Sequence, residues 1–186
     1  MATVAVLHNT LEFRGGADAV CLHVCEALQA AHDVTLWTLS HPPMADLNAM
    51  FETAADVPVR TPPASDPLAR LFDVAGDRLG GQMAVRSLAL QAYYRRRASG
   101  VDLTVSTTNE LGVPGPSLQY VHYPQFNATE GGRLNGLWSR LAGLGDGRLP
   151  GGATLLANSG WTADVVAERY DRRPTVVHPP VSTIED

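Results

Sequence analysis

Short apolar runs alternate along the chain with longer segments whose apolar residues recur every three or four positions. Thr3–His8 is a nearly continuous apolar run, which predicts a strand buried on both faces. Gly15 and Gly16 follow it and open a segment with helical spacing, and Asp33–Leu39 is a second apolar run. The residues at helical spacing are Ala17, Val20, Cys21, Val24 and Leu28. A strand, a glycine turn, a helix and a strand in this order predict a right-handed βαβ unit.

The same alternation continues to the end of the chain. We expect helices at Gln82–Arg97, Arg133–Leu144 and Ser159–Tyr170. We expect strands at Val57–Arg60, Val101–Ser106, Leu118–Val121, Thr154–Ala157 and Thr175–Val177. The rest of the proline-rich stretch His41–Pro67 is expected to be irregular, and Gly145–Gly152 a glycine-rich turn. The pattern predicts an α/β fold with a doubly wound, mostly parallel, Rossmann-like sheet.

Composition narrows the chemistry. The chain has 186 residues and a net charge of −5, which argues against general nucleic-acid binding. All 14 basic residues are arginine, so no lysine can form a Schiff base or a Walker-type phosphate grip. Cys21 and Cys25 lie four apart in a predicted helix; we expect them in the core, since a zinc site needs more ligands. No metal and no cofactor is expected.

Nothing in the sequence indicates secretion or a membrane span. The apolar run Val4–Leu7 is too short for a signal peptide, and the cysteines form no disulfide framework. We therefore expect a cytoplasmic protein, and peripheral contact at the inner membrane face stays open.

Three segments could carry chemistry. Arg14–Asp18 follows the first strand and opens a helix, where free backbone amides attract phosphate. The alternative is that the glycines serve only a tight turn, which needs them for its dihedral angles. His122 is at the end of a strand and could donate a hydrogen bond to a substrate hydroxyl, and Tyr123 offers an aromatic face for stacking. The alternative is that His122 is a structural histidine whose ring is hydrogen-bonded to backbone carbonyls. Asn158 and Ser159 precede a helix, with Ser159 as the expected N-cap.

Two further features have mainly structural explanations. We expect Trp161 to be a packing residue at the helix start. Tyr93–Arg97 is the end of a predicted helix, and its three arginines complement the negative end of the helix dipole. The alternative is that these arginines contact an anionic lipid or a phosphorylated acceptor. The sequence lacks GxSxG, HExxH and a P-loop, so these hydrolase and nucleotide-binding schemes have no support.

The order of three segments resembles the N-terminal domain of family 4 retaining glycosyltransferases, which have the GT-B fold. These segments are Gly15–Asp18, Tyr120–Pro124, and Leu155–Thr162 continuing to Val176–Val181. The last two segments look most like the branch that includes the lipid-linked oligosaccharide α-1,2-mannosyltransferase. The resemblance implies that residues 1–178 form the acceptor-side domain and 179–186 begin an interdomain linker. It also implies that the donor-binding C-terminal domain is absent.

The resemblance assigns roles to particular residues. Gly15 and Gly16 match the loop that contacts the donor diphosphate, and His122 matches a histidine near the transferred sugar. The acceptor side of the cleft is expected to include Arg14, Asp18, Asn109, Tyr123, Asn158 and Ser159. The implied substrates are a nucleotide-sugar and a glycan or lipid-linked acceptor, and the implied partner is a C-terminal GT-B domain, in cis or in trans.

This sequence departs from the family at two points. Asp18 stands where the family often has glutamate, and the second-domain Glu-x7-Glu motif and arginine-lysine pair are missing. A departing diphosphate needs strong charge compensation, so we expect the chain alone to be inactive. Two alternatives stay open. One is a non-catalytic module of the same fold that binds a glycan, a lipid-phosphate or a partner. The other is an unrelated Rossmann-like nucleotide-binding protein.

Overall fold

The computed structural model describes residues 1–63, 82–123, 140–144, 149 and 152–181. The predicted helix Arg133–Leu144 and the turn Gly145–Gly152 lie largely outside these residues. None of the described helices combines the length and the apolar character that crossing a bilayer requires.

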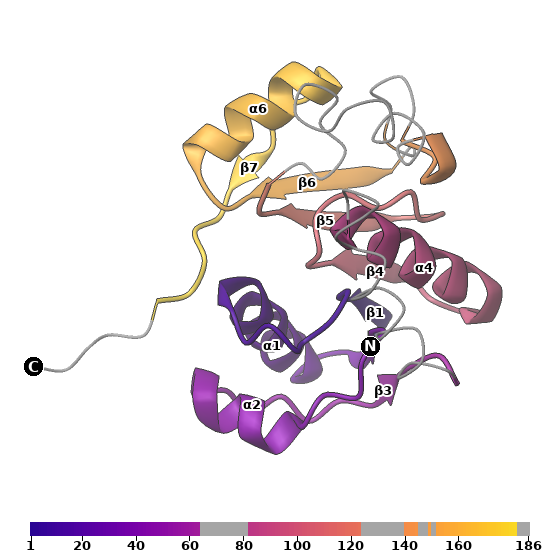
Figure 1. Cartoon of the computed structure of the whole chain (residues 1–186), viewed down its shortest axis with the longest axis vertical. Helices are drawn as coiled ribbons and strands as arrows, with labels where there is room; N and C mark the ends of the chain where they lie inside the picture. The colour runs from indigo at the N-terminus through magenta and orange to yellow at the C-terminus, as the bar shows by residue number, and fades with distance from the viewer. Residues whose placement is uncertain (64–81, 124–139, 145–148, 150–151, 182–186) are drawn as a thin grey trace, which may run out of the picture.

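Seven parallel strands form a single sheet in the order β3-β2-β1-β4-β5-β6-β7 (Figure 1). The strand order reverses direction between β1 and β4, so the sheet is doubly wound and the predicted fold class is confirmed. The strands are β1 Thr3–Leu7, β2 Asp33–Trp37, β3 Val59–Arg60, β4 Leu103–Ser106, β5 Ser117–Val121, β6 Ala153–Ala157 and β7 Thr175–Val176.

One face of the first half of the sheet is covered by helices α1, Gly16–Gln29, and α2, Met44–Phe51. Val4 and Val6 of β1 point to this face and pack with Leu22 of α1 and Leu47 of α2, all of them buried. The alternate residues Ala5 and Leu7 point to the other face, as the two-residue period of a strand requires. The nearly continuous apolar run of β1 is therefore explained by burial on both faces.

The opposite face of the sheet is covered by helix α4, Gln82–Arg97, whose Leu90 and Tyr94 pack on β1 and β2. Trp37 at the end of β2 lies between Tyr93 and Tyr94, with ring centroids 5.5 and 5.3 Å away. Helix α6, Gly160–Tyr170, packs its Val166 and Tyr170 against the end of β5 and against β6. The core is therefore built on both sides of the sheet.

Helix α2 overturns one expectation. The stretch His41–Pro67 was expected to be irregular apart from one strand, and this is wrong for Met44–Phe51. Met44, Leu47 and Phe51 recur at helical spacing and pack against the core beside α1. The prolines were misleading because they flank the helix: Pro43 stands at its N-cap, where a missing N–H breaks no hydrogen bond of the helix.

Helix α1 lies close to the expected face but is rotated relative to it. Leu22 and Cys25 are fully buried, whereas Val24 and Leu28 are only partly covered. The expectation that Cys21 and Cys25 pack in the core is confirmed, since both are free thiols in the interior. This rotation turns Val24 and Leu28 toward a groove beside the sheet.

Candidate functional site

The carboxyl ends of β1, β4 and β5 meet at one edge of the sheet, beside the point where the strand order reverses. Ligands of open α/β sheets bind at this edge. His8 follows β1, Thr107 and Asn109 follow β4, and His122 follows β5. We call this part of the molecule the polar edge, and we add to it the loop Arg14–Gly16 that leads into α1.

His8 and Asp18 form a buried pair at the centre of the polar edge. His8 Nε2 lies 2.8 Å from Asp18 Oδ1, and the side chains of both residues are almost fully covered. The other ring nitrogen, Nδ1, lies 3.0 Å from Thr107 Oγ1 and 3.2 Å from the Thr107 carbonyl oxygen. The second carboxylate oxygen of Asp18 accepts the backbone N–H of Gly15 at 3.2 Å. One imidazole thus connects the ends of two strands with the start of α1.

The surroundings of His8 favour its protonated form. Burial by itself lowers the pKa of His8, but the Cys21 sulfur, the hydrogen bond to Asp18 and the Asp18 charge together raise it above 6.5. Burial raises the pKa of Cys21 well above its ordinary range, so this thiol is neutral near pH 7. Asp18 is therefore one of the groups that raise the pKa of His8, through its hydrogen bond and its charge.

Asn109 fixes the backbone beside the second histidine. Its Oδ1 accepts the N–H groups of His122 at 2.7 Å and of Tyr123 at 3.1 Å. Asn109 has φ of +70°, a left-handed conformation that asparagine tolerates better than most residues. Ser106 Oγ donates to the Asn109 carbonyl oxygen at 2.7 Å and holds this turn. Asn109 therefore positions His122 and Tyr123 rather than presenting its Oδ1 to a ligand.

The His122 ring is neutral at pH 7. Burial, followed by repulsion from His8, lowers the pKa of His122 to about 4; the Thr107 backbone and the Asp18 charge oppose this less strongly. The ring lies edge-on to Tyr120, with centroids 5.0 Å apart. Its Nε2 is buried and has no hydrogen-bond partner among the described residues. A buried imidazole nitrogen without a partner is uncommon in folded proteins.

The backbone does not require the two glycines before α1. Gly15 has φ of −105°, Gly16 is the first helical residue, and a Cβ at either position would meet nothing within 4 Å. By contrast, a Cβ at Gly112 would collide with the carbonyl oxygen of Ala142. The alternative of a tight turn that needs glycine for its dihedral angles is therefore wrong. The glycines leave open space at the start of α1, where the Gly15 N–H donates to the Asp18 carboxylate and the Asp18 N–H donates to the Gly15 carbonyl oxygen.

Arg14 precedes these glycines in an uncommon conformation. Its φ is +52°, in the left-handed region that costs a residue with a Cβ about 1 kcal/mol, and its side chain is exposed. An exposed guanidinium here adds a positive charge to the N-terminal end of the α1 dipole. The loop therefore combines one exposed cation with open space at Gly16, while the Gly15 N–H is held by Asp18.

The start of α6 borders the polar edge on its β5–β6 side. Ser159 is the N-cap, and its Oγ accepts the Thr162 N–H at 3.2 Å, as expected. Thr162 Oγ1 lies 2.6 Å from Asn158 Oδ1 and 3.3 Å from the His122 carbonyl oxygen, so it joins this helix to the end of β5. Trp161 was expected to be a packing residue. This is wrong, because the side chain at this solvent-facing position is 61% exposed.

The structure thus brings most of the expected site residues to one edge of the sheet. Arg14, Gly15 and Gly16 lie on one side of the histidines, and Tyr123, Asn158 and Ser159 on the other. Asp18 differs from its expected place on the acceptor surface, because it is only 2% exposed and turned toward His8. Sequence reasoning missed His8 and Thr107. A histidine that ends a buried strand, with an aspartate one helical turn into the next helix, was the available signal.

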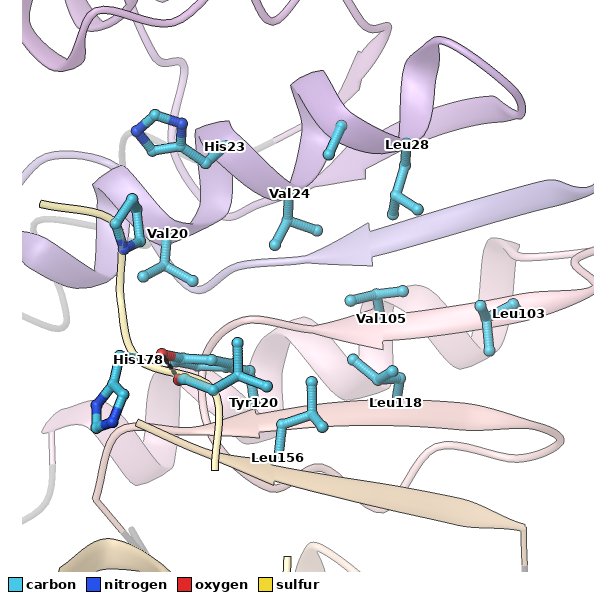
Figure 2. Close-up of a pocket in the computed structure, with 13 residues that line it drawn as sticks. Val20, His23, Val24, Leu28, Leu103, Val105, Leu118, Tyr120, Leu156 and His178 are labelled. Carbon is cyan, nitrogen blue, oxygen red and sulfur yellow. Dashed lines mark hydrogen bonds between the residues drawn. The ribbon is translucent and has the colours of Figure 1, made fainter. Parts of the chain in front are cut away.

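An apolar groove lies apart from the polar edge. Helix α1 covers the sheet only as far as β4. A cavity of about 320 Å³ lies beside this helix, over β4, β5 and β6 (Figure 2). Val24 and Leu28 form one wall, and Leu118, Tyr120 and Leu156 form the floor. The Tyr120 hydroxyl donates to the Val177 carbonyl oxygen at 2.7 Å and fixes the chain that leaves β7 across one end of the groove. This apolar lining is a poor match for a diphosphate or a sugar.

The arrangement offers hydrogen bonds and charge for binding a ligand. Among the residues that the structure describes, no three His, Cys, Asp or Glu side chains are placed to hold a metal ion. The polar edge offers amide donors and one cation on one side and a neutral imidazole in the middle. This combination suits a phosphorylated ligand with a neighbouring hydroxyl group.

Comparison with known proteins assigns no family. No family model and no curated protein matches the chain. Among solved structures, it is similar to a crystal structure of NmrA, a negative transcriptional regulator in complex with NAD. The two chains are 14% identical with a TM-score of 0.33, and the match covers 95% of this chain and 74% of that chain. A similarity this low carries no argument about ligands here.

We predict that Asp18→Asn lowers the pKa of His8 relative to the wild type. The substitution removes the negative charge of Asp18, which is one of the causes that raise this pKa against burial. Histidine NMR titration of the wild type and the variant measures this shift directly. Asp102→Asn, at the amino end of the same sheet, is the matched control and should leave the His8 titration unchanged. An unaltered His8 pKa in Asp18→Asn would show that the carboxylate does not control this proton.

A second prediction concerns stability. Between pH 6.5 and about 4 the unfolded chain binds a proton at His122 that the folded chain does not, so the free energy of unfolding falls as pH falls. In His122→Asn this fall in the free energy of unfolding should be smaller by about 1 to 2 kcal/mol, a figure that allows for the partial exposure of the ring. Urea denaturation of both proteins at pH 7 and pH 4.5 tests it. Parallel pH dependence in the two proteins would contradict the low pKa.

Proposed function

We propose that this chain is the acceptor-side half of a glycosyltransferase that moves a sugar from a nucleotide-sugar to a glycan or lipid-linked acceptor. One observation carries the proposal. Two adjacent glycines that the backbone does not need open onto the edge that also holds the neutral, unpartnered imidazole of His122. A diphosphate can approach the backbone at Gly16 closely, because no atom stands where its side chain would be.

The chemistry at His122 supports this function. A neutral imidazole can form a hydrogen bond with a hydroxyl of the transferred sugar, and a pKa of about 4 keeps it neutral throughout the physiological range. Burial is the main cause of this low pKa, and repulsion from His8, whose own pKa is raised, adds to it. The His122 ring is therefore available for a neutral hydrogen bond.

The chain supplies only part of what sugar transfer needs. The leaving diphosphate has to be stabilised by strong, fixed positive charge, and this edge offers one exposed arginine and a helix dipole. We therefore propose that a second, donor-binding domain faces the polar edge and completes the site. This requirement follows from charge compensation and does not depend on the position at which the sequence ends.

The apolar groove favours a second candidate, a binding module of the same fold without catalysis. Its Leu118, Tyr120 and Leu156 floor suits a lipid chain or an apolar partner surface. On this reading the histidines and glycines have no catalytic task, and the groove is the functional surface. Phosphate binding at the polar edge separates the two candidates, because only the first requires it.

We predict that pyrophosphate, used as a probe for the donor diphosphate, shifts the backbone amide NMR signals of Gly15 and Gly16. Gly16→Val should abolish these shifts, because its side chain fills the space in front of the amides while the helix still forms. Gly160→Val, at the equivalent first position of α6, is the matched control and should leave the binding intact. Equal binding by all three proteins would remove the support for a diphosphate loop.

A further inference from the structure

Two aromatic rings stack on each other where the polar edge meets α6. The rings of Tyr123 and Trp161 have centroids 5.7 Å apart and an angle of 19° between their planes. Tyr123 directly follows His122, and its backbone is held by Asn109. Trp161 is in the first turn of α6, next to Thr162, whose hydroxyl lies 3.3 Å from the His122 carbonyl oxygen. The stack is therefore fixed next to the unpartnered imidazole.

Packing of the core does not explain why Trp161 is a tryptophan. Its side chain is 61% exposed, whereas Trp37 in the same chain is 4% exposed and lies between two tyrosines. Tryptophan is highly buried on average, because it has the largest apolar surface to remove from water. In Trp161 one ring face is covered by Tyr123, and most of the remaining surface is open. A rigid aromatic face of this kind is suited to a flat apolar ligand surface.

A polar group lies beside the stack. The carboxamide oxygen of Asn158 is used by Ser159 and Thr162, which fixes the side chain. Its NH2 group makes no hydrogen bond to another described residue. An aromatic face with an adjacent amide donor matches the two surfaces of a pyranose ring, which has C–H groups on its faces and hydroxyls at its rim.

We propose that the Tyr123–Trp161 stack is a platform for a pyranose ring of the acceptor, with the Asn158 NH2 group donating to one of its hydroxyls. This inference rests on the proposed function, since it assigns the acceptor sugar to the β5–β6 side of His122 and the donor diphosphate to the Gly15–Gly16 side. A nucleobase could also stack on an indole. The sugar is favoured because the phosphate loop lies at the other end of the polar edge, beyond the histidines.

The test is an NMR titration of the chain that follows the indole N–H signal of Trp161, which is assigned as the signal missing from Trp161→Phe. The probes are methyl α-D-mannopyranoside, methyl β-D-glucopyranoside, D-glucitol and uridine. We expect at least one pyranoside to shift the signal and D-glucitol not to, because it has hydroxyls but no ring face. Equal shifts with D-glucitol, a larger shift with uridine, or no shift with either pyranoside would overturn the platform.

Variants make the test specific. Trp161→Ala should weaken pyranoside binding, measured on ligand signals by saturation transfer, at least about tenfold, and Trp161→Phe should weaken it less, since a ring face remains. Phe13→Ala removes another exposed aromatic ring and should leave binding unchanged. Because Trp161 is exposed, the variants should keep the wild-type circular dichroism spectrum. Unchanged binding in Trp161→Ala would overturn the platform.

The same samples separate this inference from the proposed function. Pyrophosphate binding at Gly15 and Gly16 is measured in parallel and should be unaffected by Trp161→Ala. If the pyranosides do not bind while pyrophosphate does, the platform is wrong and the proposed function stands. If pyranosides bind at Trp161 and pyrophosphate does not bind, the stack is a sugar site, but its assignment to a transferase acceptor is overturned.

Discussion

The contact between the imidazole of His8 and the carboxylate of Asp18 organises the edge of the sheet where ligands can bind. The two groups lie 2.8 Å apart and are shielded from water, so each needs the other to avoid an unpaired buried charge. The same carboxylate holds the Gly15 N–H, and the same imidazole contacts Thr107. A single buried interaction therefore sets the position of the glycine loop relative to the ends of β1 and β4.

This interaction also contributes to the electrostatics of the neighbouring strand. Burial lowers the pKa of His122, and repulsion from His8, whose pKa is raised, lowers it further. Asn109 accepts the N–H of His122 and so fixes the backbone that carries this ring. The polar edge thus has open space at Gly15 and Gly16 on one side and a stacked aromatic pair on the other. The proposed division between donor and acceptor follows this asymmetry.

Much of the fold could be predicted from local pattern, and the site only in part. The apolar run of β1 and the spacing of Gln82–Arg97 are determined by neighbours in sequence, and the structure confirms both elements. Helix α2 was missed because flanking prolines carried more weight than the spacing of Met44, Leu47 and Phe51. The site depends on contacts between residues far apart: Thr107 is 99 residues from His8, and no local pattern encodes their meeting. The openness at the glycines is likewise a property of the folded chain.

The central claim is that His122 works at a sugar-transfer site that a second domain completes. The most direct measurement is transfer by this chain joined after Pro180 to a competent donor-binding half of a family 4 glycosyltransferase, with His122→Ala compared with the parent. His23→Ala, a partly exposed histidine in the wall of the apolar groove, is the control. We expect His122→Ala to lower the transfer rate about tenfold or more while the protein stays folded, because this is the loss expected for one hydrogen bond to the reacting sugar. We expect His23→Ala to leave the transfer rate unchanged. Equal transfer by the parent and the His122 variant would contradict the claim.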